Sequence, residues 1–117
     1  MGIVSNLAAY CHGEPWLAAA LDYLDGNRRY LAELLAGHLP GVRYTPPEAT
    51  YLAWLDCREL GIGSEPSEYF LEHARVATNP GLAFGTNGSG HVRFNFATSR
   101  AILTQAVEAI AASVAGR

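Results

Sequence analysis

The 117-residue sequence has no lysine, so its eight basic side chains are all arginines. This absence excludes Schiff-base chemistry from a lysine side chain. The eleven acidic residues give a net charge of −3, which argues against nucleic-acid binding because that needs a basic face. No apolar run approaches the roughly 18–20 residues that span a membrane, and residues 1–6 lack the parts of a secretory signal. We therefore expect a cytoplasmic protein without nucleic-acid or membrane partners.

Cysteine and histidine are too few and too scattered to suggest a metal site. Cys11 and Cys57 form no CxxC motif, and both stand among apolar residues. We expect two reduced, buried thiols, with a single disulfide between them as the alternative. The four histidines are spread over positions 12, 38, 73 and 91. The sequence therefore predicts no metal site, and no spacing suggests a nucleophile paired with a base.

The longest predicted element is a helix over residues 15–36. Pro15 suits the first helical position, and Gly37 and Pro40 mark the end. Its apolar stripe consists of the leucines at positions 17, 21, 24, 31 and 35. Such a helix is about 33 Å long, more than so small a domain can cover. We expect another body to cover part of it, and a bend at Gly26–Asn27.

Shorter elements follow in alternation. Strands are predicted near residues 42–44, 51–56, 76–78 and 91–96, a short helix over 64–75, and a C-terminal helix that begins at Thr98 or Ser99. The short helix has Ser64 as its expected N-cap and Phe70, Leu71 and Ala74 on its buried side. The C-terminal helix has an apolar stripe at Ile102, Leu103, Ala106, Val107, Ile110 and Val114.

The last predicted strand alternates between two kinds of residue. Val92, Phe94 and Phe96 share an apolar face, which we expect to meet the helices. The fold class is therefore α/β in the α+β, two-layer sense. We expect a small mixed or antiparallel sheet of about four strands with helices on one face.

Arg93 is the most informative candidate for a binding site. It is predicted in the middle of the last strand, on the polar face, with Asn95 beside it. A planar guanidinium on a rigid strand suits a carboxylate ligand. Two structural alternatives remain: an arginine on a solvated sheet face, and one paired with Asp56 on a neighbouring strand.

Other candidate residues have simpler interpretations. Segment 85–90 reads GxxGxG and precedes a strand, so we interpret it as a flexible turn and not as a phosphate cradle. Thr50 and Tyr51 favour a strand. Trp16 and Trp54 are expected in the core or at an interface. The residues alone show no catalytic set.

Six ordered stretches together give the sequence a family resemblance. They read AAY (8–10), GEPWL (13–17), YLDGNR (23–28), PEATYLAWLD (47–56), PGLAFG (80–85) and VRFNFA (92–97). In this order they resemble the C-terminal small domain of fold-type I enzymes that depend on pyridoxal phosphate (PLP). Within the class I/II aminotransferase family, the chain is most similar to the branch of MalY/PatB-type cystathionine β-lyases.

The resemblance implies a division of labour within a larger enzyme. Residues 1–40 would form a helical segment between domains, and residues 41–117 the small domain. Arg93 would bind the α-carboxylate of an amino-acid substrate, with Asn95 as a weaker contact. The lysine, the aspartate and the phosphate-binding residues that hold PLP belong to the large domain of such enzymes. We therefore expect no catalytic, cofactor-binding or metal-binding residue in this chain, and no PLP bound to it alone.

Two hypotheses about the function follow. The parent enzyme would be a homodimeric aminotransferase or C–S β-lyase acting on amino acids, with this chain not catalytic alone. The alternative is a stand-alone, non-catalytic module that binds a small carboxylate or associates with a partner.

Overall fold

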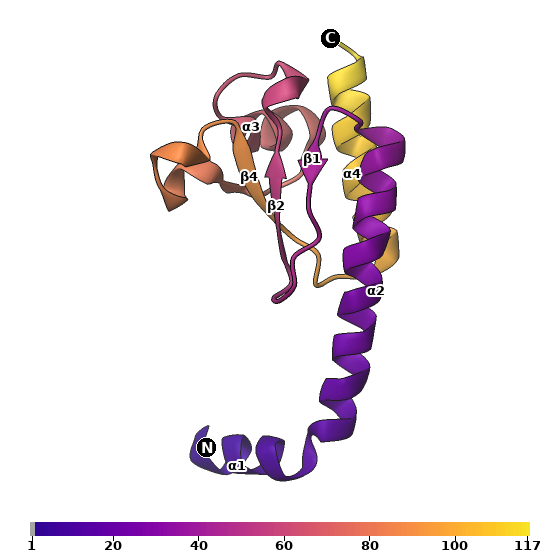
Figure 1. Ribbon diagram of the computed structural model, residues 1–117, viewed down its shortest axis with the longest axis vertical. Coiled ribbons are helices and arrows are strands. Elements are labelled where there is room, and N and C mark those ends of the chain that lie inside the picture. Colours follow the sequence, from indigo (N-terminus) through magenta and orange to yellow (C-terminus); the bar gives the residue numbers. More distant parts are fainter. Residues whose placement is uncertain (1) are drawn as a thin grey trace.

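An arm of two helices leads into a layered body in the computed structural model, which describes residues 2–117 (Figure 1). Helix α1 spans Gly2–His12 and helix α2 spans Glu14–His38. At the corner between them, a Cβ on Gly13 would lie 2.4 Å from the carbonyl oxygen of Ala9. Only glycine fits this corner, which lets one helix follow the other at once. Helix α1 is absent from the elements that the sequence predicts.

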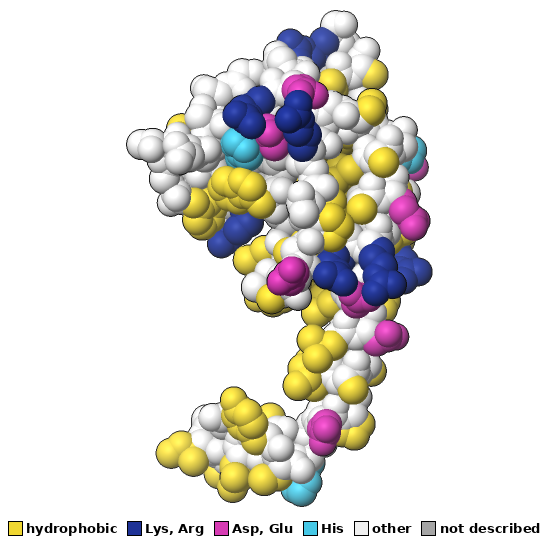
Figure 2. Space-filling view, viewed as in Figure 1, with side chains coloured by type: hydrophobic (Ala, Val, Ile, Leu, Met, Phe, Trp, Pro, Cys, Tyr) yellow, Lys and Arg dark blue, Asp and Glu magenta, His cyan; other side chains and the backbone are white. Residues whose placement is uncertain are grey.

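Helix α2 confirms the predicted long helix and continues without interruption through Gly26–Asn27. Its leucine stripe is buried only in the C-terminal half. Leu31 and Leu35 are covered, whereas Leu17 and Leu21 are 50 % and 57 % exposed. Figure 2 shows hydrophobic side chains lying open along the arm. The first turns of the stripe stay exposed because the body of the chain does not reach them, as expected for a helix longer than the domain.

Four short strands form one sheet. They are β1 (Arg43–Tyr44), β2 (Leu52–Asp56), β3 (Asn79–Pro80) and β4 (His91–Asn95). Their spatial order is β1-β2-β4-β3, and each neighbouring pair is antiparallel. The predicted small sheet is confirmed, but its third strand lies at Asn79–Pro80 and not at 76–78. Proline has no N–H to donate, and it is tolerated here because β3 is an edge strand.

Helices α2 and α4 (Arg100–Ala115) pack against one face of the sheet (Figure 1). The predicted apolar face is confirmed on β4 and the residue after it: Val92 and Phe96 are fully buried, and Phe94 is 6 % exposed. Burying each of these side chains contributes about 1.5–3 kcal/mol relative to leaving it in water. The helices therefore fix which face of β4 is apolar, and hence which face carries Arg93.

The start of α4 is set by a side-chain cap. Ser99 Oγ accepts a hydrogen bond from the backbone N–H of Ile102 at 3.3 Å, so Ser99 and not Thr98 is the N-cap. Leu103, Val107 and Ile110 are buried as predicted. Ile102 is 54 % exposed, so its place in the predicted stripe is wrong.

The short helix between β2 and β3 is irregular. Helix α3 covers only Pro66–Tyr69, and a π-helical turn, Phe70–Ala74, continues it. Its N-cap is Glu65 and not the predicted Ser64. Phe70 is buried as predicted, but Leu71 is 56 % exposed. The predicted buried side of this helix is therefore wrong at Leu71.

The two cysteines are free and lie in different environments. Cys57 is 1 % exposed, and burial raises the pKa of its thiol to about 12. Cys11 lies exposed on α1, so the prediction that both thiols are buried is wrong for Cys11. Trp16 is likewise 76 % exposed on the arm, so it lies outside the core, and its predicted place at an interface stays a prediction. The chain itself provides nothing to cover the arm at either residue.

The described residues contain neither a candidate metal site nor a candidate membrane-spanning helix. No group of three or more histidine, cysteine and acidic side chains within residues 2–117 is placed to hold a metal ion. None of the helices in that range combines the length and apolarity that crossing a membrane requires.

Candidate carboxylate site

Arg93 lies at the centre of the sheet. In the register of the strands it faces Trp54 on β2 and Asn79 on β3. Its neighbours Val92 and Phe94 point toward the helices, so its side chain leaves from the opposite face. The alternative that Arg93 pairs with Asp56 is excluded, because Asp56 binds Arg58 instead.

Asn79 binds one edge of the Arg93 guanidinium. Its Oδ1 accepts hydrogen bonds from Nε at 3.3 Å and from Nη2 at 3.0 Å. A guanidinium has five N–H groups, and this contact uses two of them. Within residues 2–117, Nη1 and the outer N–H of Nη2 have no protein partner. The free terminal edge, Nη1 and Nη2, can donate two parallel hydrogen bonds to a carboxylate.

Phe84 covers one face of the same group. The Arg93 Cζ lies 4.6 Å from the centre of the Phe84 ring, which is a cation–π distance. The ring in turn meets Trp54 edge to face, with ring centres 5.8 Å apart. Trp54 is therefore 41 % exposed on the outer sheet face, at this site and not in the core.

Asn95 is on the same strand face but has a local role as well. Its Oδ1 accepts a hydrogen bond from the backbone N–H of Ala97 at 2.8 Å, which shapes the turn after β4. Thr50 and Tyr51 precede β2 and do not extend it. Thr50 has a backbone φ of 68°, which is unusual for a β-branched residue, and its Oγ1 accepts from the N–H of Leu52 at 3.3 Å. This pair therefore forms a turn, contrary to the prediction of strand.

The glycine-rich segment forms a tight turn in which the amides of its glycines are occupied. The N–H of Gly88 donates to the carbonyl of Gly85 at 2.9 Å, and the N–H of Gly90 donates to that of Ser64 at 2.9 Å. These groups are not available to cradle a phosphate. The turn predicted over residues 85–90 is confirmed and contains the 3₁₀ turn Thr86–Gly88. The 3₁₀ turn Gly81–Phe84 precedes it and carries Phe84.

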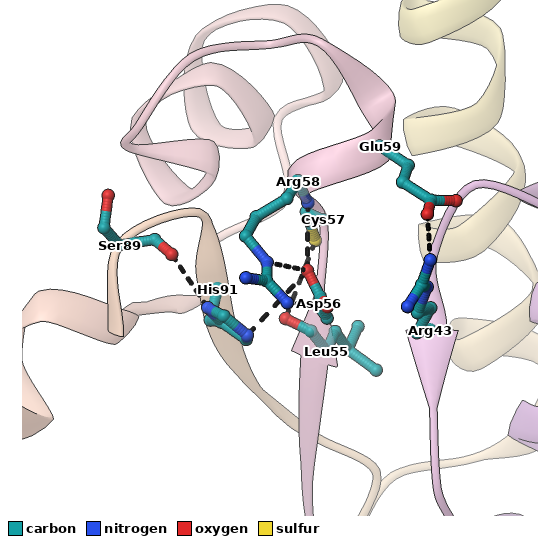
Figure 3. Close-up of polar contacts among 8 residues, drawn as sticks. All are labelled: Arg43, Leu55, Asp56, Cys57, Arg58, Glu59, Ser89 and His91. Atoms are coloured by element: carbon teal, nitrogen blue, oxygen red, sulfur yellow. Dashed lines mark hydrogen bonds and ion pairs between the residues drawn. The ribbon is translucent and has the colours of Figure 1, made fainter. Parts of the chain in front are cut away.

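A second polar network lies at the far end of β2 and β4 (Figure 3). Arg58 donates from Nε and Nη2 to the two carboxylate oxygens of Asp56, at 2.9 and 2.7 Å. These hydrogen bonds hold the pKa of Asp56 far below its usual range. His91 Nδ1 lies 2.8 Å from the carbonyl of Ser89, which only accepts, so Nδ1 carries the proton. Its Nε2 then faces Asp56 Oδ1 at 3.8 Å.

This network makes part of the stability depend on pH. The folded-state pKa of Asp56 is lowered, so its contribution is present above the unfolded value of about 3.9 and is lost as the pH falls toward the folded value. We expect Asp56→Asn to lower the free energy of unfolding at pH 7 and to weaken the loss of stability below about pH 4. Urea denaturation at a series of pH values measures both. The exposed Asp22→Asn is the control, and equal pH profiles for the two variants would contradict the prediction.

Comparison with known proteins shows what the chain is similar to. No protein-family model matches it. A candidate cystathionine β-lyase of Mycobacterium leprae is 48 % identical over 92 % of the chain, and the protein MalY of Escherichia coli is 36 % identical over 92 %. The crystal structure of a candidate PLP-dependent β-cystathionase from Corynebacterium diphtheriae superposes on 92 % of the chain with a TM-score of 0.89 and 42 % identity. The chain is homologous to cystathionine β-lyases of the MalY/PatB type over about 30 % of their length.

Coverage of the MalY/PatB relatives is partial. The chain spans 30 % of the Mycobacterium leprae protein, 28 % of MalY and 29 % of the Corynebacterium diphtheriae chain. The expected fold, a small antiparallel sheet with helices on one face, is that of the small domain in PLP-dependent enzymes of fold type I. Sequence reasoning identified Arg93 in this domain but missed Asn79 and Phe84. The antiparallel register and a tight turn bring both of them to the arginine.

Proposed function

We propose that this chain is the substrate-carboxylate-binding small domain of a PLP-dependent enzyme that acts on amino acids, as a C–S β-lyase or an aminotransferase. The observation that carries the proposal is the state of Arg93. Its guanidinium is held on one edge by Asn79 and on one face by Phe84, while its terminal edge is free. An α-carboxylate matches that edge in shape and charge.

The expected division of the chain belongs to this proposal. Residues 1–40 connect to a large domain, and residues 41–117 form the body that carries Arg93. The exposed apolar side chains of the arm support it, since a neighbouring domain would cover them. A cytoplasmic homodimer is the assembly we propose for the parent enzyme.

The residues of this chain do not fit a covalent PLP site. The sequence has no lysine, so no side-chain amine is available to bond the cofactor. In the proposed enzyme the cofactor is held elsewhere, and this chain contributes binding and orientation. Arg93 fixes the substrate by two parallel hydrogen bonds, and such positioning lowers the barrier of a reaction that takes place on the α-carbon.

The test is the response of this chain to small carboxylates. We expect L-alanine, titrated into the ¹⁵N-labelled chain, to shift the NMR resonances around Arg93 with a dissociation constant on the order of millimolar. Arg93→Gln should weaken binding at least about ten-fold, because it removes a charge-assisted bidentate pair. Arg75→Gln is the matched control, since this change removes the same charge elsewhere on the chain. Equal affinity in wild type and Arg93→Gln would overturn the proposal.

A further inference from the structure

The partners of Arg93 are uncharged, unlike those of four other arginines of the chain. Arg28, Arg29, Arg43 and Arg58 each pair with a carboxylate of the chain. Arg93 has no ion pair within residues 2–117, and its partners are a neutral amide and an aromatic ring. Both partners fix the guanidinium without neutralising it, so its positive charge stays available to a ligand.

We propose that Asn79 and Phe84 are positioning residues that make Arg93 receive a carboxylate end-on, through Nη1 and Nη2. This inference rests on the proposed function, since it assumes that Arg93 binds a carboxylate. Asn79 occupies the Nε edge, which is the other edge able to form a bidentate pair. Phe84 occupies one face and limits the tilt of the plane. A carboxylate then approaches in line with the guanidinium.

The backbone holds Asn79 in place. It pairs with Arg93 in the register of β3 and β4, so the two side chains leave adjacent strands on the same face. Pro80 follows, and its ring restricts the backbone of Asn79 to extended conformations. The amide therefore meets Arg93 in a fixed geometry. An aspartate at this position would bring a charge that competes with the ligand.

Phe84 is fixed although it is 52 % exposed. Its turn is anchored by a backbone contact between Gly81 and Gly88, so close that a Cβ on Gly81 would lie 2.1 Å from the carbonyl oxygen of Gly88. Trp54 meets the ring from the side. The ring is thus supported at its base and at one edge, and it presents its face to Arg93.

The experiment follows the side-chain resonances of Arg93 during a titration with L-alanine. In the wild-type chain we expect the Nη groups to shift and to rotate more slowly, while the Nε–H resonance changes little. Asn79→Ala opens the Nε edge, so Nε–H should now shift on titration. Asn79→Asp should weaken binding at least about ten-fold because of its negative charge.

Two replacements of Phe84 test whether its aromatic face, and not only its apolar bulk, supports binding by Arg93. Phe84→Leu keeps an apolar side chain and removes the aromatic face, and we expect about three-fold weaker binding. Phe84→Tyr keeps the face and should bind within about two-fold of wild type. Leu82→Ala, an exposed change in the same turn, is the control and should bind like wild type.

The outcomes separate this inference from the proposed function. If Arg93→Gln binds as tightly as wild type, the proposed function itself is wrong. If Arg93→Gln loses binding but Nε–H shifts as strongly as the Nη groups in the wild-type chain, the end-on geometry is wrong. If Phe84→Leu and Phe84→Tyr bind equally well, Phe84 is not a positioning residue.

Discussion

Replacing Asn27 with alanine should lower the free energy of unfolding by about 2–4 kcal/mol. Asn27 is fully buried on α2, and its Nδ2 donates to the carbonyls of Phe96 at 3.0 Å and Thr98 at 2.8 Å. These partners lie 69 and 71 residues away, in the turn between β4 and α4. Alanine would leave both carbonyls without this donor, that of Phe96 in a buried site and that of Thr98 in a partly buried one. Urea denaturation followed by circular dichroism measures the change.

The matched control for this change is Asn6→Ala. Asn6 lies exposed on α1, so the same replacement should change stability by less than about 0.5 kcal/mol. Asn27→Asp provides a second check, because a carboxylate cannot donate to a carbonyl and should destabilise the chain at neutral pH. If Asn27→Ala unfolds at the same urea concentration as Asn6→Ala, the two hydrogen bonds from Asn27 to the turn after β4 contribute nothing to stability.

Gly88→Ala should be the other severe change, with a loss of about 3 kcal/mol or more. Gly88 is buried, and a Cβ there would lie 1.9 Å from the carbonyl oxygen of Gly81 and 2.8 Å from the amide nitrogen of Leu82. Both contacts are backbone atoms, so no side-chain rotation relieves them. The turn that carries Phe84 must move. Thermal unfolding measures the loss, and the NMR resonances of Phe84 and Trp54 report the displacement.

Gly37→Ala separates this steric cost from the general effect of adding a methyl group. Gly37 is helical, and a Cβ added there would meet nothing within 4 Å. Alanine should stabilise the helix there by up to about 1 kcal/mol. A Gly88→Ala variant as stable as wild type would show that the Gly81–Gly88 contact yields without cost.

Local patterns predicted the elements that the chain can bury by itself. The alternation in β4 and the C-terminal half of α2 are correct because the apolar side of each meets a covered core. The error at Cys11 falls on a surface that the chain leaves open. Cys11 stands among apolar residues, as do Leu17 and Trp16, but no described part of the chain covers these side chains. A sequence pattern reports that a surface is apolar, and it does not report which body covers it.

The residues of the candidate site also fall into those that a sequence pattern predicts and those that it does not. Alternation along one strand was enough to put Arg93 and Asn95 on the polar face. The partners of Arg93 come from positions 79 and 84, whose arrangement depends on strand register and on contact between two glycines. Neither is a periodic signal. The one available hint was chemical: a short glycine-bounded segment that contains an aromatic residue just before the strand that carries the arginine.

The 25 residues of α2 also make it a lever arm. Its C-terminal half is embedded in the body, its N-terminal half stands free, and Asn27 lies close to the fulcrum. From Glu14 to Asn27 the rod is about 20 Å long, so a tilt of about 5° at the fulcrum moves the far end by about 2 Å. Conversely, a domain bound to the N-terminal half of α2 can reorient the whole sheet through a small rotation of the helix. The orientation of the Arg93 guanidinium then depends on the angle of this one helix.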